Sequence, residues 1–315
     1  MKRANVKGCV VFLLGGIGVM SIHPLLRRQT SRTAQANPLT QPIANKENHV
    51  DYAGVRFTFD PSLASSVESG TIPAVVEGMP ADIVPEHPSF RLVGYPRIQN
   101  MRPSDPKIKV FSIAKFREAV SIASKADAKN VVYPLNPPDW TTYFDTEVRV
   151  LKALMASKPA QASVGRFLAK ARGESGCSAA MPFLPMWKAC QAFASHVRYV
   201  NFKNGQGVFF LTQWDTETEQ ISNDGLEYAY QGITNDGRYW VYAEFSVTAP
   251  FLPRGDEPEV VAWNEKNYLL SHKSKEYQNY LRPVLTKLEA LPANKFQPNL
   301  ELVEQLIGSL EVQSK

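Results

Sequence analysis

Apolar residues recur at alternate positions along three segments in the first half of the chain. The segments are 55–59, 90–94 and 108–112. In the first of them, Val55 and Phe57 alternate with polar neighbours, which is typical of a strand with one buried face. We expect the three segments to be strands one to three of a single sheet.

Two segments with helical spacing come next. Apolar residues recur every three or four positions in 114–123 and again in 144–156, and this period predicts an amphipathic helix in each. The segment 133–140 between them contains three prolines, which neither a helix interior nor a central strand accommodates. We expect that segment to be an ordered loop or a cover over another part of the fold.

The second half of the chain begins with strands and ends with helices. A short helix through Ala189 and Phe193 is expected to lead into the strands, and the acidic segment 215–223 is expected to be a solvated hairpin tip. The expected strands are 197–202, 208–214, 226–233 and 238–247, followed by helices 259–271, 275–291 and 300–310 and a last strand, 311–312. Strands in a run followed by helices in a run predict an α+β fold, an antiparallel β-sheet flanked by helices.

The strands 226–233 and 238–247 carry the clearest hairpin signal of the chain. The residues between them include the sequence Asn-Asp-Gly, which ends at Gly237. Glycine supplies the positive φ that a tight hairpin turn requires. We therefore expect two neighbouring central strands joined by a turn whose role is conformational.

Four aromatic residues of this region are candidates for a binding surface: Trp214, Tyr228, Trp240 and Tyr242. Because successive side chains of a strand alternate, Trp240 and Tyr242 point away from the face of their apolar neighbours. If helices cover only one face of the sheet, these aromatics form a recognition surface for a protein or small-molecule ligand. The alternative is that the Pro-rich segment covers the second face and that the aromatics belong to the core.

The N-terminus has the pattern of an export signal. Three cations precede the apolar run 8–20, which is shorter than the roughly 20 residues that a spanning helix needs. Residues 1–21 are therefore predicted to be a signal peptide cut near Ser21 or, as the alternative, an uncleaved anchor that attaches the protein to a membrane. Residues 22–50 are polar and predict a flexible linker, and residues 51–315 predict a single α+β domain. The expected location is extracytoplasmic, either periplasmic or secreted.

The positive charge of the chain is concentrated at its N-terminus. The chain has 35 Lys and Arg against 30 Asp and Glu, but six of the cations and none of the acids lie in residues 1–36. The remainder is close to neutral, with 29 cations and 30 acids. A nucleic-acid-binding domain carries a clustered basic surface, so the sequence predicts no nucleic-acid partner.

Cys177 and Cys190 are the two cysteines beyond the signal segment. In an exported protein, two cysteines that close a short loop favour a disulfide. The alternative is a pair of unrelated buried thiols, because spacing alone does not bring two sulfur atoms together.

No catalytic or metal-binding pattern stands out in the sequence. Ser175 lies in Gly-Glu-Ser-Gly-Cys, which departs from the G-x-S-x-G motif and does not follow a strand. The histidines are too widely spaced for a zinc site. The glycine-containing turn 204–207 does not open a helix, so it predicts no phosphate site. The sequence predicts no catalytic residue, no metal and no cofactor.

Four segments carry a resemblance to known proteins: YAGVRFTFDPSLA (52–64), MPFLPMWKACQAF (181–193), NFKNGQGVFFLTQW (201–214) and LEYAYQGITNDGRYWVYAEF (226–245). They resemble a widespread group of uncharacterised bacterial exported proteins, many of them lipoproteins. The shared pattern is an NGxGxRFLTQ strand followed by a YxFQGxTxDGxYYV hairpin. This chain has Val208-Phe209-Phe210 without the arginine of the pattern, and it has no lipobox.

A looser likeness concerns the two ends of the predicted domain. GVRFTFDPS (54–62) and FQPNLELVEQLIGSLEV (296–312) are similar to the ends of PsbP/Mog1-like domains, in which helices sandwich an antiparallel sheet. Members of that fold are mostly binding or assembly factors, so the likeness implies a non-enzymatic exported binding or assembly module of unknown ligand. The alternative is a secreted hydrolase with an unrecognised site.

Overall fold

An antiparallel hairpin of β11 (Glu227–Thr234) and β12 (Tyr239–Ser246) forms the centre of the structure. The computed structural model describes residues 43–45, 48–76, 82–96, 106–127, 140–172, 180–184 and 189–313. In the turn, Gly237 adopts a φ of 71°, a value that glycine accepts without the steric penalty of a Cβ atom. Thr234 Oγ1 donates to Asp236 Oδ1 at 2.6 Å and accepts the Tyr239 N–H at 3.1 Å. The predicted hairpin is confirmed, and its turn residues serve the backbone.

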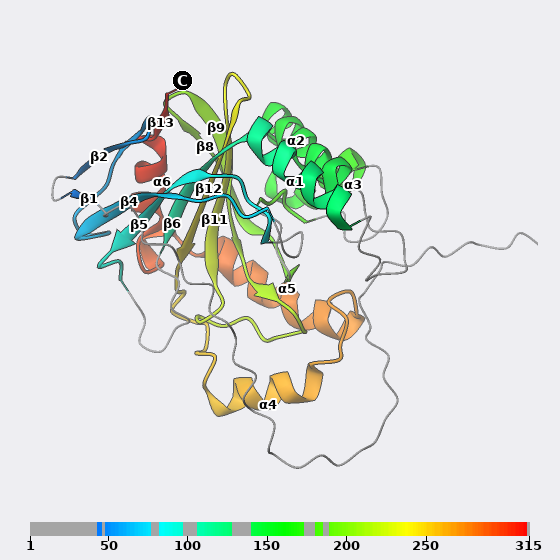
Figure 1. Ribbon diagram of the computed structural model, residues 1–315. Coiled ribbons are helices and arrows are strands. Elements are labelled where there is room, and N and C mark those ends of the chain that lie inside the picture. Colours follow the sequence, from blue (N-terminus) through cyan, green and yellow to red (C-terminus); the bar gives the residue numbers. More distant parts are fainter. Residues whose placement is uncertain are drawn as a thin grey trace, which may run out of the picture.

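The hairpin lies in the middle of an eight-stranded sheet, counted over the described residues (Figure 1). All neighbouring strands are antiparallel. The expected α+β class, with an antiparallel sheet flanked by helices, is confirmed. The strand order is β1 (Ile43–Asn45), β4 (Ser66–Ile72), β5 (His87–Val93), β6 (Lys107–Ser112), β12, β11, β9 (Gly205–Thr212) and β8 (Ser195–Phe202).

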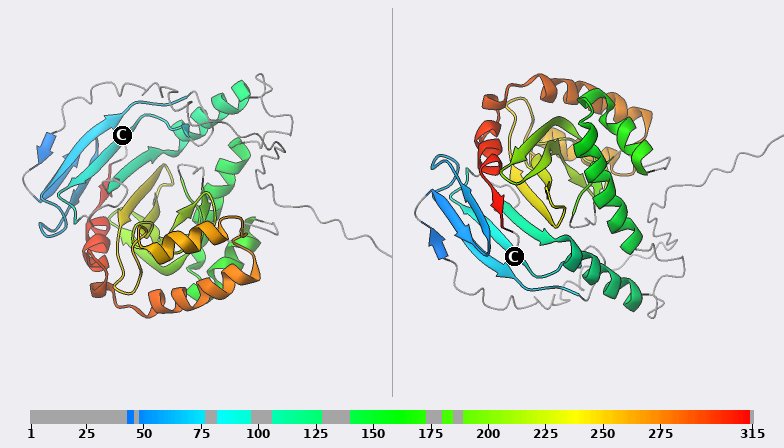
Figure 2. Two further views of the ribbon diagram at one scale, coloured as in Figure 1. Left: turned by 90° about the horizontal axis from the view of Figure 1, so that it is seen from below. Right: turned by 90° about the horizontal axis from the view of Figure 1, so that it is seen from above.

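Different elements pack on the two faces of this sheet (Figure 2). The first face packs against α5 (Lys275–Ala290), α6 (Leu300–Gly308) and a small sheet of β2 (His49–Tyr52), β3 (Val55–Thr58) and β13 (Glu311–Val312). The second face packs against α1 (Ile113–Asp127), α2 (Trp140–Ser157) and α3 (Gln161–Arg172). The helix α4 (Pro258–Asn267) packs Trp263 against Tyr277 and Tyr280 of α5, and the short 3-10 helix η3 (Ala293–Lys295) follows α5 in the chain.

The alternation of β12 divides its side chains between two hydrophobic cores. Val241 and Phe245 are fully buried in the core under α5 and α6. Trp240 is fully buried in the core under α1, α2 and α3. Both faces of the central strands are therefore covered, as expected for strands that are apolar at nearly every position.

Two glycines make room for one buried tyrosine at the centre of the sheet. A Cβ atom on Gly207 would lie 2.3 Å from the Tyr230 hydroxyl, and one on Gly232 would lie 2.6 Å from the Tyr230 ring. Tyr230 is fully buried, and its hydroxyl donates to the Val200 carbonyl at 3.1 Å. The glycines of the sequence pattern 201–214 and 226–245 thus have a packing role.

Two expectations about local elements are wrong. The strand at 55–59 is β3, which pairs with β2 and β13 in the small sheet and is not the first strand of the main sheet. The helix expected through Ala189 and Phe193 is absent from the described residues, because β7 (Cys190–Gln191) pairs with β10 (Trp214–Asp215). The Ala192 N–H donates to the Gln213 carbonyl at 3.0 Å, so the backbone is held extended.

The N-terminal boundary of the folded body also differs from the expectation. Strand β1 pairs with β4 and lies inside the range 22–50 that was predicted to be a linker. The signal segment 1–21 and most of the Pro-rich segment 133–140 lie outside the described residues. None of the helices that the structure describes is long and apolar enough to span a membrane.

Substitutions at Gly237 test the conformational role of the turn. Replacing Gly237 by Val places a β-branched residue at positive φ and should lower the free energy of unfolding by about 1–3 kcal/mol. Asn tolerates this conformation, and the only atoms near a Cβ here belong to the flexible Lys152 side chain. The free energy of unfolding should therefore fall much less in Gly237→Asn. Equal losses for the two variants in urea unfolding would contradict a backbone origin of the effect.

Candidate functional site

The second face of the sheet is divided into an apolar half and a polar half. The apolar half lies under α1, α2 and α3, as described above. Beyond it, on β4, β5, β6 and β12, polar residues occupy the same face. We call six of them the polar half-face: Glu68, Ser89, Arg91, Lys107, Lys109 and Glu244. Parts of these side chains stay in solvent, with 41% of Arg91 and 30% of Glu68 exposed.

Strand register places four charged residues of this set in one row across the sheet. Glu68 stands opposite Arg91, Arg91 opposite Lys107, and Lys107 opposite Glu244. Glu68 accepts from the Arg91 guanidinium, with Nε at 2.9 Å. Arg91 and Lys107 carry like charges directly opposite each other, an arrangement that destabilises a sheet by itself.

Tyr242 lies at the border of the polar half-face, opposite Lys109. Its hydroxyl donates to Glu244 Oε2, and Lys109 Nζ lies 5.6 Å from the centre of its ring. Burial raises the pKa of the Tyr242 phenol well above its usual range, and Glu244 adds to the rise. Burial lowers the pKa of Lys109, and Lys107 lowers it further.

Aromatic side chains form the border between the apolar and polar halves. The Phe183 ring lies 4.4 Å from that of Trp214 and packs edge-on against Tyr242 at 5.4 Å. Gln231 anchors the segment that carries Phe183, because its Oε1 accepts the Leu184 N–H at 3.3 Å. The same oxygen accepts the Trp240 indole N–H at 2.5 Å.

The structure corrects the expectation of an exposed surface formed by Trp214, Tyr228, Trp240 and Tyr242. Tyr228 lies on the first face, where its hydroxyl donates to Glu304 at 2.8 Å. Trp240 and Tyr242 are buried on the second face, and Trp214 is half-buried beside them. The helices α1 to α3 and the segment around Phe183 cover the rings of the second face. Trp214 and Tyr242 both pack against Phe183 at the border of the polar half-face and do not form an open aromatic surface.

Three buried polar atoms near Tyr242 have no hydrogen-bond partner among the described residues: Gln231 Nε2, Glu244 Oε1 and His87 Nε2. Gln231 is 0% exposed and His87 is 2% exposed. An unpartnered buried polar group costs about 1–3 kcal/mol, and such groups are uncommon in native proteins. Their presence beside Lys109 marks this part of the sheet as the candidate functional site.

The sequence reasoning missed these polar residues. Lys107 and Lys109 alternate with apolar residues in a predicted strand, as a solvated sheet face does. Glu244 interrupts an aromatic strand, and that interruption was the available signal. Only the pairing of β6 with β12 brings the two lysines to the glutamate.

His87, which contributes one of the unpartnered atoms, is a neutral imidazole in the folded protein. Its Nδ1 lies 2.7 Å from the Pro85 carbonyl oxygen, which can only accept, so Nδ1 carries the proton. Burial lowers the pKa of His87 to about 4, and the nearby Lys109 lowers it as well. The unpartnered Nε2 is therefore an acceptor at neutral pH.

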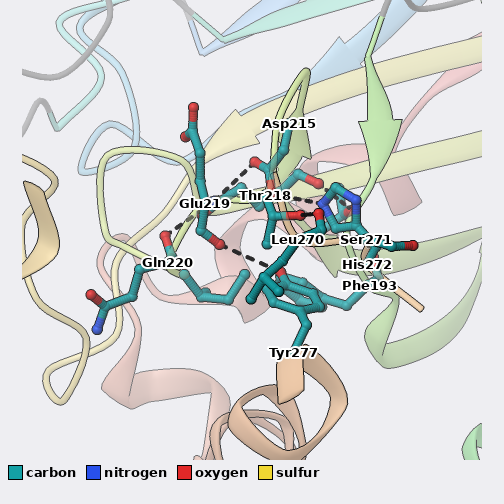
Figure 3. A network of polar contacts seen from close by, with 12 residues as sticks. Phe193, Asp215, Thr218, Glu219, Gln220, Leu270, Ser271, His272 and Tyr277 are labelled. Atoms are coloured by element: carbon teal, nitrogen blue, oxygen red, sulfur yellow. Dashed lines mark hydrogen bonds and ion pairs between the residues drawn. The ribbon is translucent and has the colours of Figure 1, made fainter. Parts of the chain in front are cut away.

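A second polar network joins the acidic loop to the connection between α4 and α5 (Figure 3). The side chain of Asp215 is fully buried, and it accepts from Gln213 Nε2 at 3.0 Å. His272 Nε2 lies 3.5 Å from the other Asp215 carboxylate oxygen. Thr218 is buried and donates to the Leu270 carbonyl. The expectation that 215–223 is a solvated hairpin tip is therefore wrong, because these contacts fasten the loop to the body.

A hollow of about 360 Å³ lies beside this network. It is lined by Glu217, Thr218, Glu219, Asn264, Glu265 and Tyr268. Within the described ranges, no hydroxyl or thiol forms a hydrogen bond with the His272 ring. A hydrolytic triad requires a nucleophile hydrogen-bonded to its histidine, and the described residues show none at His272.

Neither a metal site nor a disulfide is found in the described part of the chain. No group of three or more His, Cys, Asp or Glu residues there could hold a metal ion. Cys190 is an exposed free thiol, while Cys177 lies outside the described residues. The pairing of these two cysteines stays a prediction.

Comparison of the chain with family models, with curated proteins and with solved structures gives no match. The likeness to exported bacterial proteins and to PsbP/Mog1-like domains therefore stays a prediction. The residues that carry the hairpin motif have structural roles in this fold, as the contacts of Gln231, Thr234 and Gly237 illustrate.

The depressed pKa of His87 predicts a loss of stability in mild acid. The folded state disfavours the imidazolium form of His87. The contribution of His87 to the free energy of unfolding is therefore complete above about pH 6.5 and is lost as the pH falls toward 4. When the pH is lowered from 7.5 to 4.5, the free energy of unfolding of the native protein should fall by roughly 2–3 kcal/mol more than that of a His87→Gln variant. Chemical unfolding of both proteins at the two pH values measures this difference. An identical loss in both proteins would show that His87 is not held neutral by the fold.

Proposed function

We propose that this protein is an exported, non-enzymatic binding module that holds a small polar ligand on the polar half-face. The observation that supports the proposal is the group of unpartnered buried polar atoms around Tyr242. Gln231 Nε2 offers a donor, and Glu244 Oε1 offers an acceptor. A ligand that paired with both atoms would recover the free energy that each loses without a partner.

The surroundings of these atoms favour the binding of a small molecule. The polar half-face contains charges of both signs, and the rings of Phe183 and Trp214 border it. Small-molecule sites typically combine aromatic walls with a few fixed polar groups. The polar groups stand on strands in the middle of the sheet, which keeps their positions rigid.

A secreted hydrolase is the second candidate, favoured by the hollow beside the acidic loop. Glu217, Glu219 and Glu265 line that hollow, and a pair of carboxylates can serve as acid and base in glycoside hydrolysis. We prefer the binding module, because unpartnered buried polar atoms gather around Tyr242 and Lys109 on the polar half-face.

Export is the part of the proposal that rests on the N-terminal segment. The protein should be recovered outside the cytoplasm, and there Cys177 and Cys190 should be joined by a disulfide. Intact-mass spectrometry without reductant should find the exported chain lacking two hydrogens and resistant to alkylation at Cys190. Recovery of the chain only from the cytoplasm would refute export, and alkylation of both thiols in exported material would refute the bridge.

Binding at the polar half-face can be tested with defined mixtures of small polar compounds, namely amino acids, hydroxy acids and monosaccharides. Saturation-transfer NMR should detect at least one compound bound to the native protein, and Glu244→Gln should weaken that binding by about tenfold or more, as expected when a charged acceptor is lost. Glu304→Gln is the matched control, because Glu304 also accepts from a buried tyrosine, on the opposite face.

Two results would count against the proposed function. The first is that no compound in the mixtures gives a transfer signal with the native protein. The second is that Glu244→Gln and Glu304→Gln change binding equally, since the effect would then follow from the loss of a tyrosine acceptor and not from a site on the second face.

A further inference from the structure

Two lysines and a glutamate lie close together on the polar half-face without pairing. Lys107 and Lys109 are two residues apart on one face of β6, and Glu244 stands directly opposite Lys107. Opposed residues of an antiparallel pair have Cβ atoms about 5 Å apart, well within reach of an ion pair. In the ranges that the structure describes, neither lysine forms a hydrogen bond or ion pair with Glu244. A ligand with groups that pair with both sides would link these charges.

The negative charge around Lys109 does not compensate its burial and the repulsion from Lys107. The nearby Glu68 is already engaged by Arg91 through its guanidinium. Lys109 is half-buried, and its cation rests on the Tyr242 ring at 5.6 Å. Burial lowers the pKa of Lys109 and the neighbouring Lys107 lowers it further, while Glu244 raises it by less. An anionic group placed between the two ammonium groups would offset both effects.

Glu244 requires a hydrogen-bond donor, which a simple anion does not supply. Its Oε2 accepts from the Tyr242 hydroxyl, while its Oε1 is buried and has no partner among the residues described. An incoming carboxylate would be repelled by this charge unless the ligand also brought a hydrogen-bond donor to Oε1. The site therefore calls for an anion and a donor on the same small molecule.

We infer that the ligand of the polar half-face is a small carboxylate with a hydroxyl or ammonium group on the adjacent carbon. This inference rests on the proposed function and names its ligand class. The carboxylate lies between Lys107 and Lys109, and the neighbouring donor binds Glu244 Oε1. Adjacent carbons are required because the lysine and glutamate side chains rise from directly opposed positions. Gln231 Nε2 lies on the other side of Tyr242. It would donate to an additional acceptor group on a larger ligand of this class.

Ligands with only one of the two groups fit less well. A neutral polyol would satisfy Glu244 but leave the lysine cations without a counter-charge. A simple carboxylic acid would satisfy the lysines but leave Glu244 Oε1 buried and unpaired, next to a second negative charge. The class therefore comprises α-hydroxy acids and α-amino acids.

Three probes of the same carbon number separate these requirements: lactate, propionate and 1,2-propanediol. Each is titrated into the purified protein at constant ionic strength, with binding followed by NMR chemical shifts. Lactate should bind about tenfold or more tightly than propionate, as expected for one additional hydrogen bond to a charged acceptor. 1,2-Propanediol should show no saturable binding. Tighter binding of propionate or 1,2-propanediol than of lactate would overturn the inference.

Variants of Lys109 and Glu244 test separately how the two sides of the site contribute to lactate binding. Lys109→Met should weaken lactate binding about tenfold or more, while Lys287→Met should leave it unchanged, because Lys287 also lies over an aromatic ring, that of Phe251, but on α5. Glu244→Leu should remove the preference for lactate over propionate, and Glu304→Leu should retain it. If Glu244→Leu does not fold, Glu244→Gln should reduce the same preference.

The outcomes distinguish this inference from the proposed function. Lactate binding that is indifferent to Lys109→Met overturns the inference, as does a failure of lactate to bind while the mixtures contain another Glu244-dependent ligand. In both cases the polar half-face would still be a binding site, for a ligand of a different class. If the native protein binds none of the mixtures and none of the three probes, the proposed function fails together with the inference.

Discussion

The register between β11 and β12 is the constraint on which the rest of the structure depends. Successive side chains of a strand point to opposite faces, so β12 sends Val241 and Phe245 into one core and Trp240 into the other. A shift by one residue would exchange the two sets and disrupt the packing of both cores. The turn at Gly237 fixes the register at one end of the hairpin, and the hydrogen bond from Trp240 to Gln231 fixes it across the strands.

The same register creates the polar half-face. Once Trp240 is directed into the second core, Tyr242 and Glu244 follow on the same face, opposite Lys109 and Lys107. The pairing of β5 with β6 then adds Arg91 to the row. Directly opposed like charges and unpartnered buried polar atoms lower the stability of the fold. Functional residues are expected at sites that keep such unfavourable interactions. Since the central strands are rigidly packed on both faces, the fold can hold these groups in place despite their cost.

Buried ion pairs fasten the outer segments to this sheet. Glu147 of α2 and Arg172 of α3 form a two-pronged pair at 2.9 Å, with only 3% and 11% of their side chains exposed. Arg172 also donates to the Ala180 carbonyl at 2.6 Å, which ties α3 to the segment that covers Tyr242. A polar contact of 3.5 Å between His272 Nε2 and Asp215 also joins the acidic loop to the helical C-terminal part. Removing one partner of such a pair leaves an uncompensated buried charge, so these contacts specify where the outer segments lie.

The sequence by itself determined the α+β class, the central hairpin and its turn, and the C-terminal helices, because these follow from local periodicity and from the conformational freedom of Gly237. It also determined that Trp240 and Val241 point to opposite faces. Only the tertiary structure decided that both faces are covered, that the strand at 55–59 belongs to a second sheet, and that Cys190 lies in a short strand. These features depend on contacts between distant residues, such as the pairing of β7 with β10. The candidate site belongs to this second group, because Lys109 and Glu244 are 135 positions apart in the sequence and become neighbours only when β6 pairs with β12.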